Sequence, residues 1–170
     1  MHKIIYLLTA LLLASCTKEQ YVTADYVDLD RFITKWYVIA GRFTPFEDEA
    51  YNPVEHYRFA ADKQHIEVDF SFNKGSLDGE RNAFQQRAWV VNTITNAHWK
   101  IRPFWPLKLN FLILAVADDY SWAAVGVPSQ RYLWVMAKQP TLSQADMAEV
   151  LDKLNQINYS THNLVYAQHN

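Results

Sequence analysis

The feature that most constrains the fold is an alternation of apolar and polar residues with a period of two. It is clearest between His65 and Phe72, where Ile66, Val68 and Phe70 are each followed by a polar residue. Successive side chains of a β-strand point to opposite faces, so this stretch predicts a strand that is apolar on one face only.

Similar segments recur along the chain and are separated by turn residues such as Asn52-Pro53, Lys74-Gly75 and Pro128-Ser129. With the strand just described, eight segments are expected: 36–43, 54–60, 65–72, 84–91, 98–102, 109–117, 121–127 and 132–138. Eight consecutive strands with short connections favour an all-β fold, an eight-stranded antiparallel up-and-down β-barrel. Such a barrel has no free sheet edge and can hold one small ligand.

One α-helix is expected after the last of these strands. Ser143 and Asp146 have the spacing of a helix cap. Apolar residues then recur at helical steps, namely Met147, Val150, Leu151, Leu154 and Ile157. We expect this stripe to pack against the outside of the barrel, followed by a short final strand at 163–167.

The first residues have the pattern of an export signal. Lys3 precedes an apolar run from Ile4 to Leu13, which is too short to span a bilayer and is typical of a signal peptide. Leu13-Ala14-Ser15-Cys16 resembles the lipobox of bacterial lipoproteins, which implies cleavage before Cys16 and acylation of its thiol. An ordinary secretory signal with an incidental cysteine is the alternative.

The expected organisation is therefore a signal peptide (1–15), a lipidated N-terminus and polar tether (16–27) and one domain (28–170). Cys16 is the only cysteine, so a disulfide is not expected once it is acylated. Thr17 stands where an Asp would retain many lipoproteins in the inner membrane. The resemblance thus implies a lipid anchor on the periplasmic side of the outer membrane.

Charge and motif content argue against several classes of function. The net charge of −2, without a basic block beyond the signal, gives no support for a nucleic-acid partner. The six histidines do not have the spacing of metal ligands, and the serines lack a nucleophile motif. We therefore expect no metal, no cofactor and no enzymatic activity.

Four stretches together resemble the lipocalin family, in particular the apolipoprotein D-like lipoproteins of the bacterial outer membrane. They are Leu29–Ala40, with its Trp36-Tyr37 pair, then Asp119-Tyr120, Tyr132–Lys138 and Pro140–Ser143, in the family's order. The resemblance implies a barrel that binds a lipid, and members of this type can form homodimers. Two positions depart from the pattern: Thr34 replaces a glycine, and Lys138 replaces an arginine that covers the tryptophan at the barrel base.

In that family the residues at positions 36 and 138 point inward, and parity can be extended from them along each strand. Trp36 and Lys138 are then expected to seal the base. The expected lining of the interior is Val38, Ala40, Tyr57, Phe59, Val68, Phe70, Phe72, Trp99, Ile101, Trp122, Tyr132 and Trp134, with Trp122 placed by analogy alone. The strand at 109–117 is apolar on both faces, so its orientation stays open.

A large, aromatic interior favours an elongated apolar ligand, and we expect a fatty acid or a lysophospholipid. Its anionic head group would need cations at the mouth, and Arg42, Arg81 and Arg87 are the candidates. The main alternative is a structural or assembly lipoprotein that binds envelope proteins through its outer surface. An enzyme acting on a bound lipid has no support in the sequence. The turn at Phe104-Trp105 is expected to be buried, although it could instead contact a membrane or a partner.

Overall fold

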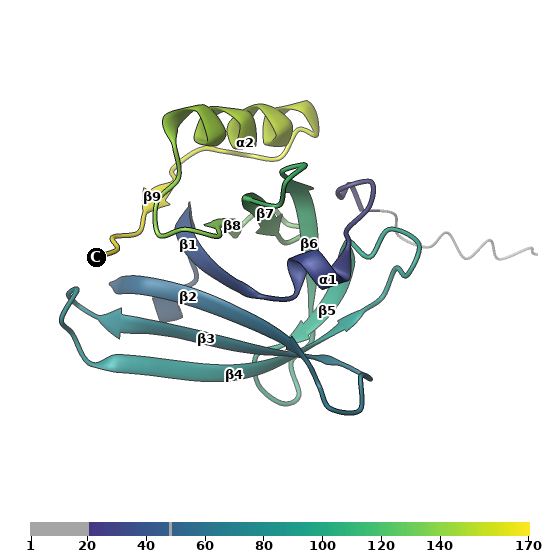
Figure 1. The fold of residues 1–170 in the computed structure, drawn as a ribbon, viewed down its shortest axis with the longest axis horizontal. Helices are drawn as coiled ribbons and strands as arrows, with labels where there is room; N and C mark the ends of the chain where they lie inside the picture. Colours follow the sequence, from purple (N-terminus) through teal and green to yellow (C-terminus); the bar gives the residue numbers. More distant parts are fainter. Residues whose placement is uncertain (1–20, 48) are drawn as a thin grey trace, which may run out of the picture.

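The computed structural model describes residues 21–47 and 49–170, and its strands form a central barrel (Figure 1). The signal peptide and Cys16 lie outside the described residues. In chain order the elements are α1 (Leu29–Phe32), β1 (Lys35–Arg42), the 3-10 helix η1 (Pro45–Glu47), β2 (Ala50–Phe59), β3 (Ile66–Lys74), β4 (Arg81–Val90), β5 (His98–Arg102), β6 (Leu109–Val116), β7 (Trp122–Gly126), β8 (Leu133–Ala137), α2 (Gln144–Gln156) and β9 (Val165–Tyr166).

The first eight strands close into an antiparallel barrel. Each strand from β2 to β8 pairs with the next, β8 pairs with β1, and β1 pairs back onto β2. Strand β9 adds to the outer side of β1. The eight-stranded antiparallel barrel, its following helix and the short final strand predicted from the alternation are thus confirmed.

The seam between β1 and β2 is short. Direct pairing runs only from Lys35↔His56 to Tyr37↔Val54. Pro53 has no N–H to offer to a neighbouring strand, and the register of β2 is irregular between Tyr51 and Val54. Beyond this point the C-terminal segment bridges the gap, because Ala167 N donates to Ile39 O and Asn52 N donates to Gln168 O.

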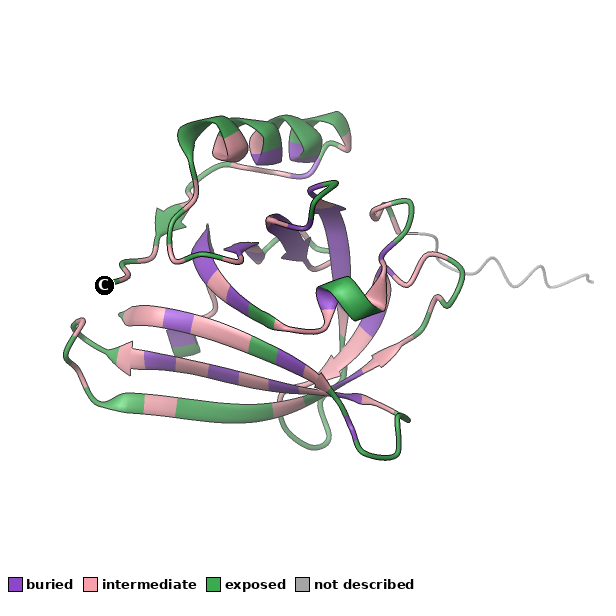
Figure 2. Cartoon of the chain, viewed as in Figure 1, coloured by how far each residue is buried: buried purple, intermediate pink, exposed green. Residues whose placement is uncertain are grey.

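Apolar side chains form two separate clusters, one inside the barrel and one beneath α2. Figure 2 shows buried residues alternating with less buried ones along β3, as the period of two requires. Helix α2 begins after Ser143, whose hydroxyl accepts from Asp146 N, and it buries Val150 and Leu154 against the outer wall. None of the helices in the described part of the chain is long and apolar enough to cross a bilayer.

The folded domain begins earlier than expected. We assigned residues up to 27 to the tether, but Val27 is fully buried in the interior cluster. Ala24 N donates to Ile113 O and Val27 N donates to Thr95 O. The tether assignment is therefore wrong for residues 21–27, because two apolar residues in a polar stretch find partners on the barrel.

Candidate functional site

The lower part of the barrel is filled by aromatic rings. The Phe32 ring contacts those of Trp36, Tyr57 and Trp99 at centroid distances of 5.4 to 5.6 Å, and Trp99 lies 5.9 Å from Phe111. All five side chains are at most 6% exposed. This part of the interior is a packed core, which forms the floor of any binding site above it.

Lys138 covers the outer side of this floor. Its Nζ lies 3.6 Å from the centroid of the Trp36 ring and donates to Arg31 O at 3.2 Å. Burial, together with the nearby Arg31 charge, lowers the pKa of Lys138 to about 8. The Trp36 indole donates to Phe32 O, so cation and ring are both held in place. Thr34 stands where the family has a glycine, and its carbonyl oxygen accepts a hydrogen bond from Tyr57 N.

Above the floor, aromatic side chains from two sides line the upper interior, which we call the cup (Phe70, Phe72, Phe84, Tyr132 and Trp134). Phe72 lies 5.4 Å from Phe70 and stacks on Phe84 at 6.1 Å. On β8, the rings of Tyr132 and Trp134 are 6.1 Å apart. Phe84, which is 49% exposed and faces Phe70 across the β3–β4 pair, was not among the expected lining residues.

Six of the expected lining residues lie in or against the interior cluster, and a seventh, Phe59, lies at the end of β2. Val38, Tyr57, Val68 and Trp99 belong to the interior cluster, and Ile101 and Trp134 pack against it. Phe59 has the parity of Tyr57 and pairs with Ile66, but it is 41% exposed near the end of β2. On β6, whose orientation stayed open, Phe111 and Ile113 lie inside whereas Leu112 and Leu114 lie beneath α2.

Two of the expected lining residues, Ala40 and Trp122, belong instead to the cluster beneath α2, so the prediction is wrong for both. A bulge between Val38 and Ala40 adds one residue to β1 and reverses the parity that follows. Trp122 pairs with Ala137, which places Ala123, the partner of Met136, inside. Because the wall under α2 is as apolar as the interior, hydropathy could not distinguish the two faces of β7.

The three candidate head-group arginines all lie on the outer wall, so this prediction is also wrong. Arg42 shares the face of Leu133 and donates to Gln130 O and His162 O. Arg81 donates to Ser71 Oγ and Asn73 Oδ1, and Arg87 is exposed opposite Glu67. A strand residue at the mouth can face either side, and here strand parity directs each arginine outward.

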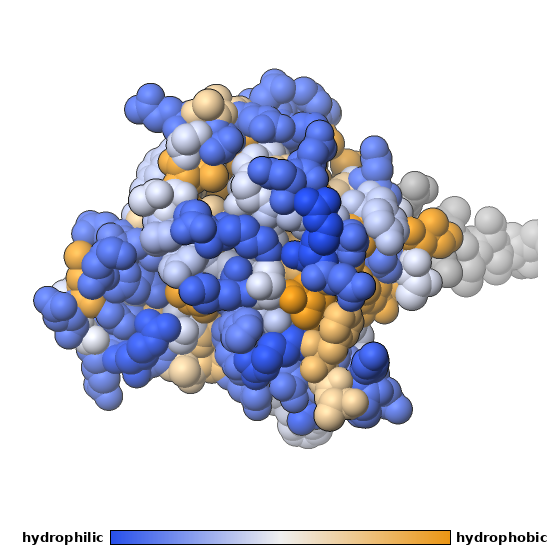
Figure 3. Space-filling model, in the orientation of Figure 1, coloured by the Kyte–Doolittle hydropathy of each residue, from blue (hydrophilic) through white to orange (hydrophobic). Residues whose placement is uncertain are grey.

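The turn between β5 and β6 is exposed, contrary to the expectation that it would be buried. Phe104 is 56% exposed and Trp105 is 81% exposed. The face shown in Figure 3 is mostly hydrophilic with scattered apolar areas. Trp105 is the most exposed aromatic side chain among the described residues.

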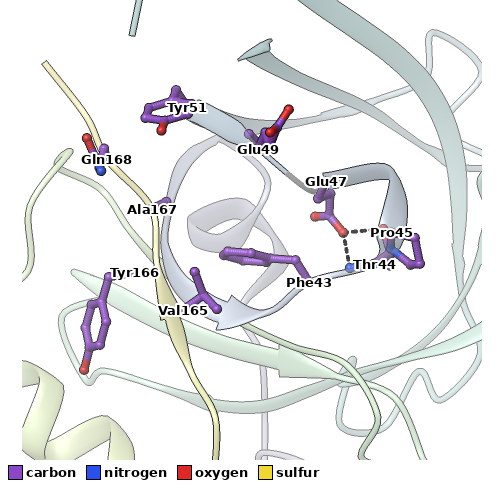
Figure 4. Close-up of a pocket in the computed structure, with 11 residues that line it drawn as sticks. Phe43, Thr44, Pro45, Glu47, Glu49, Tyr51, Val165, Tyr166, Ala167 and Gln168 are labelled. Atoms are coloured by element: carbon purple, nitrogen blue, oxygen red, sulfur yellow. Dashed lines mark hydrogen bonds between the residues drawn. The ribbon is translucent and has the colours of Figure 1, made fainter. Parts of the chain in front are cut away.

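A pocket of about 490 Å³ lies beside the seam between β1 and β2. The connection from β1 to β2 forms one wall of the pocket and the C-terminal segment forms the other (Figure 4). Its lining residues are Phe43, Thr44, Pro45, Glu47, Glu49, Ala50, Tyr51, Val165, Tyr166, Ala167 and Gln168.

Glu47 of this pocket is held by three donors. Thr44 N and Thr44 Oγ1 donate to Oε2 at 2.8 and 2.6 Å, and Trp134 Nε1 donates to Oε1 at 2.7 Å. The side chain is only 8% exposed. Three N–H and O–H donors around one carboxyl are the arrangement that stabilises an ionised carboxylate in a buried place.

Two further polar groups face the interior: Tyr57, which is among the expected lining residues, and Glu55, which is not. Glu55 pairs with Trp36 on one side and with Phe70 on the other, and Tyr57 follows it on the same face of β2. Burial raises the pKa of Glu55 to about 8, Glu47 adds to the increase, and the Tyr57 hydroxyl opposes it. Strand parity could have found Glu55, because it occupies an inward position of an otherwise apolar face. Among the described residues, no group of three His, Cys, Asp or Glu could hold a metal ion.

Comparison with known proteins agrees with this architecture. The model of the lipocalin-like domain family matches residues 27–169. The chain is 25% identical to outer membrane lipoprotein Blc of Vibrio cholerae over 99% of both chains. It is 26% identical to the protein of that name from Escherichia coli K12, over 83% of this chain and 78% of the relative.

Solved structures with the same fold share less sequence. Insecticyanin of the tobacco hornworm Manduca sexta superposes with a TM-score of 0.66 at 15% identity, covering 88% of this chain and 85% of that one. Lobster apocrustacyanin A1 gives 0.64 at 14% identity, covering 83% and 79%. Since the family model spans nearly the whole folded part, the chain belongs to the lipocalin-like domain family.

Proposed function

We propose that this protein is a membrane-anchored lipocalin that binds, stores or transports lipids, such as fatty acids or lysophospholipids, in the cell envelope. The observation that carries the proposal is the cup above a packed aromatic floor, with Phe70 and Phe72 on one side and Trp134 on another. Burying an acyl chain there contributes roughly 25 cal/mol per Å² of apolar surface removed from water. We propose a binding protein without catalytic activity.

The anchor is part of the same proposal. The relatives are named outer membrane lipoproteins, one of them aligned over 99% of both chains, and Leu13-Ala14-Ser15-Cys16 resembles a lipobox. Cys16 would carry the lipid and hold the domain on the periplasmic side of the outer membrane. Two acyl chains suffice for stable anchoring, since each buried methylene contributes about 0.8 kcal/mol.

The proposal is tested by titrating the soluble chain, beginning at Lys18 so that residues 21–27 keep their contacts, with a fluorescent fatty acid. Palmitate and a lysophospholipid should displace the probe at micromolar concentration. Phe70→Ala removes part of the cup and should weaken binding about tenfold, whereas Ile94→Ala, at an 85% exposed side chain, should leave it unchanged. A wild-type protein that binds none of these lipids would overturn the proposal.

The second candidate function is an assembly role through the outer surface, and the exposure of Trp105 favours it. A photo-crosslinker placed at position 105 in cells should then capture one envelope protein or a second copy of the chain. Crosslinks to lipid alone would exclude this role for the turn.

A further inference from the structure

Two titratable side chains, Glu55 and Tyr57, lie side by side on the interior face of β2. Glu55 faces the interior because its register partners Trp36 and Phe70 are both interior residues. Tyr57 lies two residues further along the same face and is 1% exposed. Tyr57 thus belongs to the aromatic floor, and Glu55, between Trp36 and Phe70, lies where the floor meets the cup.

Neither group is satisfied by the protein. Glu55 Oε2 and the Tyr57 hydroxyl are buried, and the only partner that the described residues offer either group is the other one, at a geometry too poor for a full hydrogen bond. The two side chains are nevertheless near enough to affect each other's ionisation. A buried polar atom without a good partner destabilises the fold, so a ligand that supplies the missing partner gains that free energy.

The charge that acts on Glu55 is negative. Glu47 is the charged group that acts on Glu55, and its carboxylate is fixed by Thr44 and Trp134. The side chains opposite Glu55 on β1 and β3 are Trp36 and Phe70, neither of which titrates. Lys138 lies over the Trp36 ring and is not among the groups that act on Glu55. A carboxylate or phosphate in this place would therefore meet a negative charge, whereas a cation would be attracted.

We propose that Glu55 and Tyr57, with Glu47 beside them, form a recognition site for the primary ammonium group of an apolar, long-chain ligand. An ammonium has three N–H donors and no acceptor, so it can donate to Glu55 Oε2 and to the Tyr57 oxygen. Its charge also offsets the repulsion between the two glutamates. This inference rests on the proposed lipid binding and names the head group that the cup selects.

Because Glu55 titrates, the affinities for a long-chain amine and for a fatty acid should depend on pH in opposite directions. Glu55 must be ionised to attract an ammonium, and burial raises its pKa to about 8. Of the groups near it, Glu47 is held by hydrogen bonds from Thr44 and Trp134, and burial raises the pKa of Tyr57 well above its usual value. Affinity for a long-chain amine should thus rise between pH 6.5 and pH 9, below the range in which the amine loses its proton. Affinity for the fatty acid of equal chain length should fall over the same interval.

The test is competition against a fluorescent lipid probe with four ligands of one chain length: hexadecylamine, hexadecanol, palmitate and hexadecyltrimethylammonium, each below its micelle concentration. At pH 8.5 hexadecylamine should bind at least tenfold more tightly than hexadecanol and palmitate. The trimethyl analogue keeps the charge but lacks N–H donors, so it should bind more weakly than the primary amine.

Variants separate the site from the chain-binding cup. Glu55→Gln should weaken hexadecylamine at least tenfold and Tyr57→Phe about threefold, while both keep the wild-type affinity for hexadecanol, which also reports that they fold. Glu149→Gln, at an exposed position of α2 outside the cup and the pocket, is the matched control and should change neither ligand. If hexadecanol and palmitate bind as well as the amine, or Glu55→Gln leaves the amine unaffected, the ammonium site is overturned while lipid binding stands. If no ligand displaces the probe, the proposed function itself fails.

Discussion

At the scale of single residues, strand parity was reliable where a strand is regular. Val68, Phe70 and Phe72 were expected on the interior face, and the structure has them there. Parity misplaced Ala40, because one extra residue in a bulge leaves no trace in the hydropathy pattern. Glu55 has the same inward parity, but the alternation alone does not show that a carboxylate on this face is buried without a good hydrogen-bond partner.

The first prediction concerns Glu55 in the empty protein. Its pKa is about 8 in the fold against 4.5 as a free side chain, so the folded state holds a proton that the unfolded state has released between these values. Wild-type stability therefore falls as pH rises from 4.5 to 8, and Glu55→Gln removes this loss. The variant should be more stable than wild type at pH 8 by roughly 2–4 kcal/mol, and of similar stability at pH 4.5.

Urea unfolding of both proteins at pH 4.5, 6 and 8 measures the difference. Other titrating groups cancel when wild type is subtracted from variant. Glu49→Gln, which changes an exposed glutamate, should show no such trend. A difference between Glu55→Gln and wild type that stays constant with pH would contradict the prediction.

At the scale of elements, the sequence predicted the strands, the helix start at Ser143 and the order of both. It did not predict how the barrel closes. Pairing between β1 and β2 ends after three residue pairs, and the C-terminal segment completes the seam. This closure depends on contacts between residues more than one hundred positions apart, such as Asn52 and Gln168, which no local pattern encodes.

The second prediction is that the segment from Val165 onward holds the seam closed. Ending the chain after Leu164 removes the pairing of β9 with β1 and the hydrogen bonds to Ile39 O and from Asn52 N. His169 also donates to Val38 O at 2.8 Å. At about 1 kcal/mol for each hydrogen bond, the truncated chain should lose roughly 2–4 kcal/mol of stability.

Urea unfolding checks this loss, and a lipid probe reports whether the pocket wall formed by Val165–Gln168 is needed for binding. The matched variant is Tyr166→Ala, which removes a side chain that is 59% exposed but keeps the backbone bonds. It should lose less than about 1 kcal/mol. Equal losses would show that the side chain, not the backbone bridge, stabilises the seam.

At the scale of the whole molecule, the proposed lipid anchor at Cys16 is close in sequence to the folded barrel. Residues 21–27 pack on the barrel, so four residues separate Cys16 from the folded part instead of eleven. Four residues span at most about 14 Å. Tyr21 lies on the wall formed by β5 and β6, where its hydroxyl accepts from Asn110 and its ring contacts His98.

The third prediction is that the wall of β5 and β6 faces the bilayer when Cys16 is lipidated. The exposed Phe104 and Trp105 form the turn of the same hairpin, and Lys108 next to them suits an anionic lipid surface. A fluorophore on Leu107→Cys in the full lipidated chain should be quenched by lipids that carry a quencher. The same label on Gly75→Cys, in the β3–β4 turn away from this wall, should not be.

Extending the tether provides the control for this orientation. Twelve Gly/Ser residues inserted after Gln20 lengthen the reach and make it flexible, so the difference in quenching between the two labels should shrink. If Trp105 contributes its own contact, Trp105→Ser in the extended chain should abolish the remaining difference. Equal quenching of the two labels in the unmodified chain would show that the short connection imposes no orientation, and the barrel would then turn freely above the membrane.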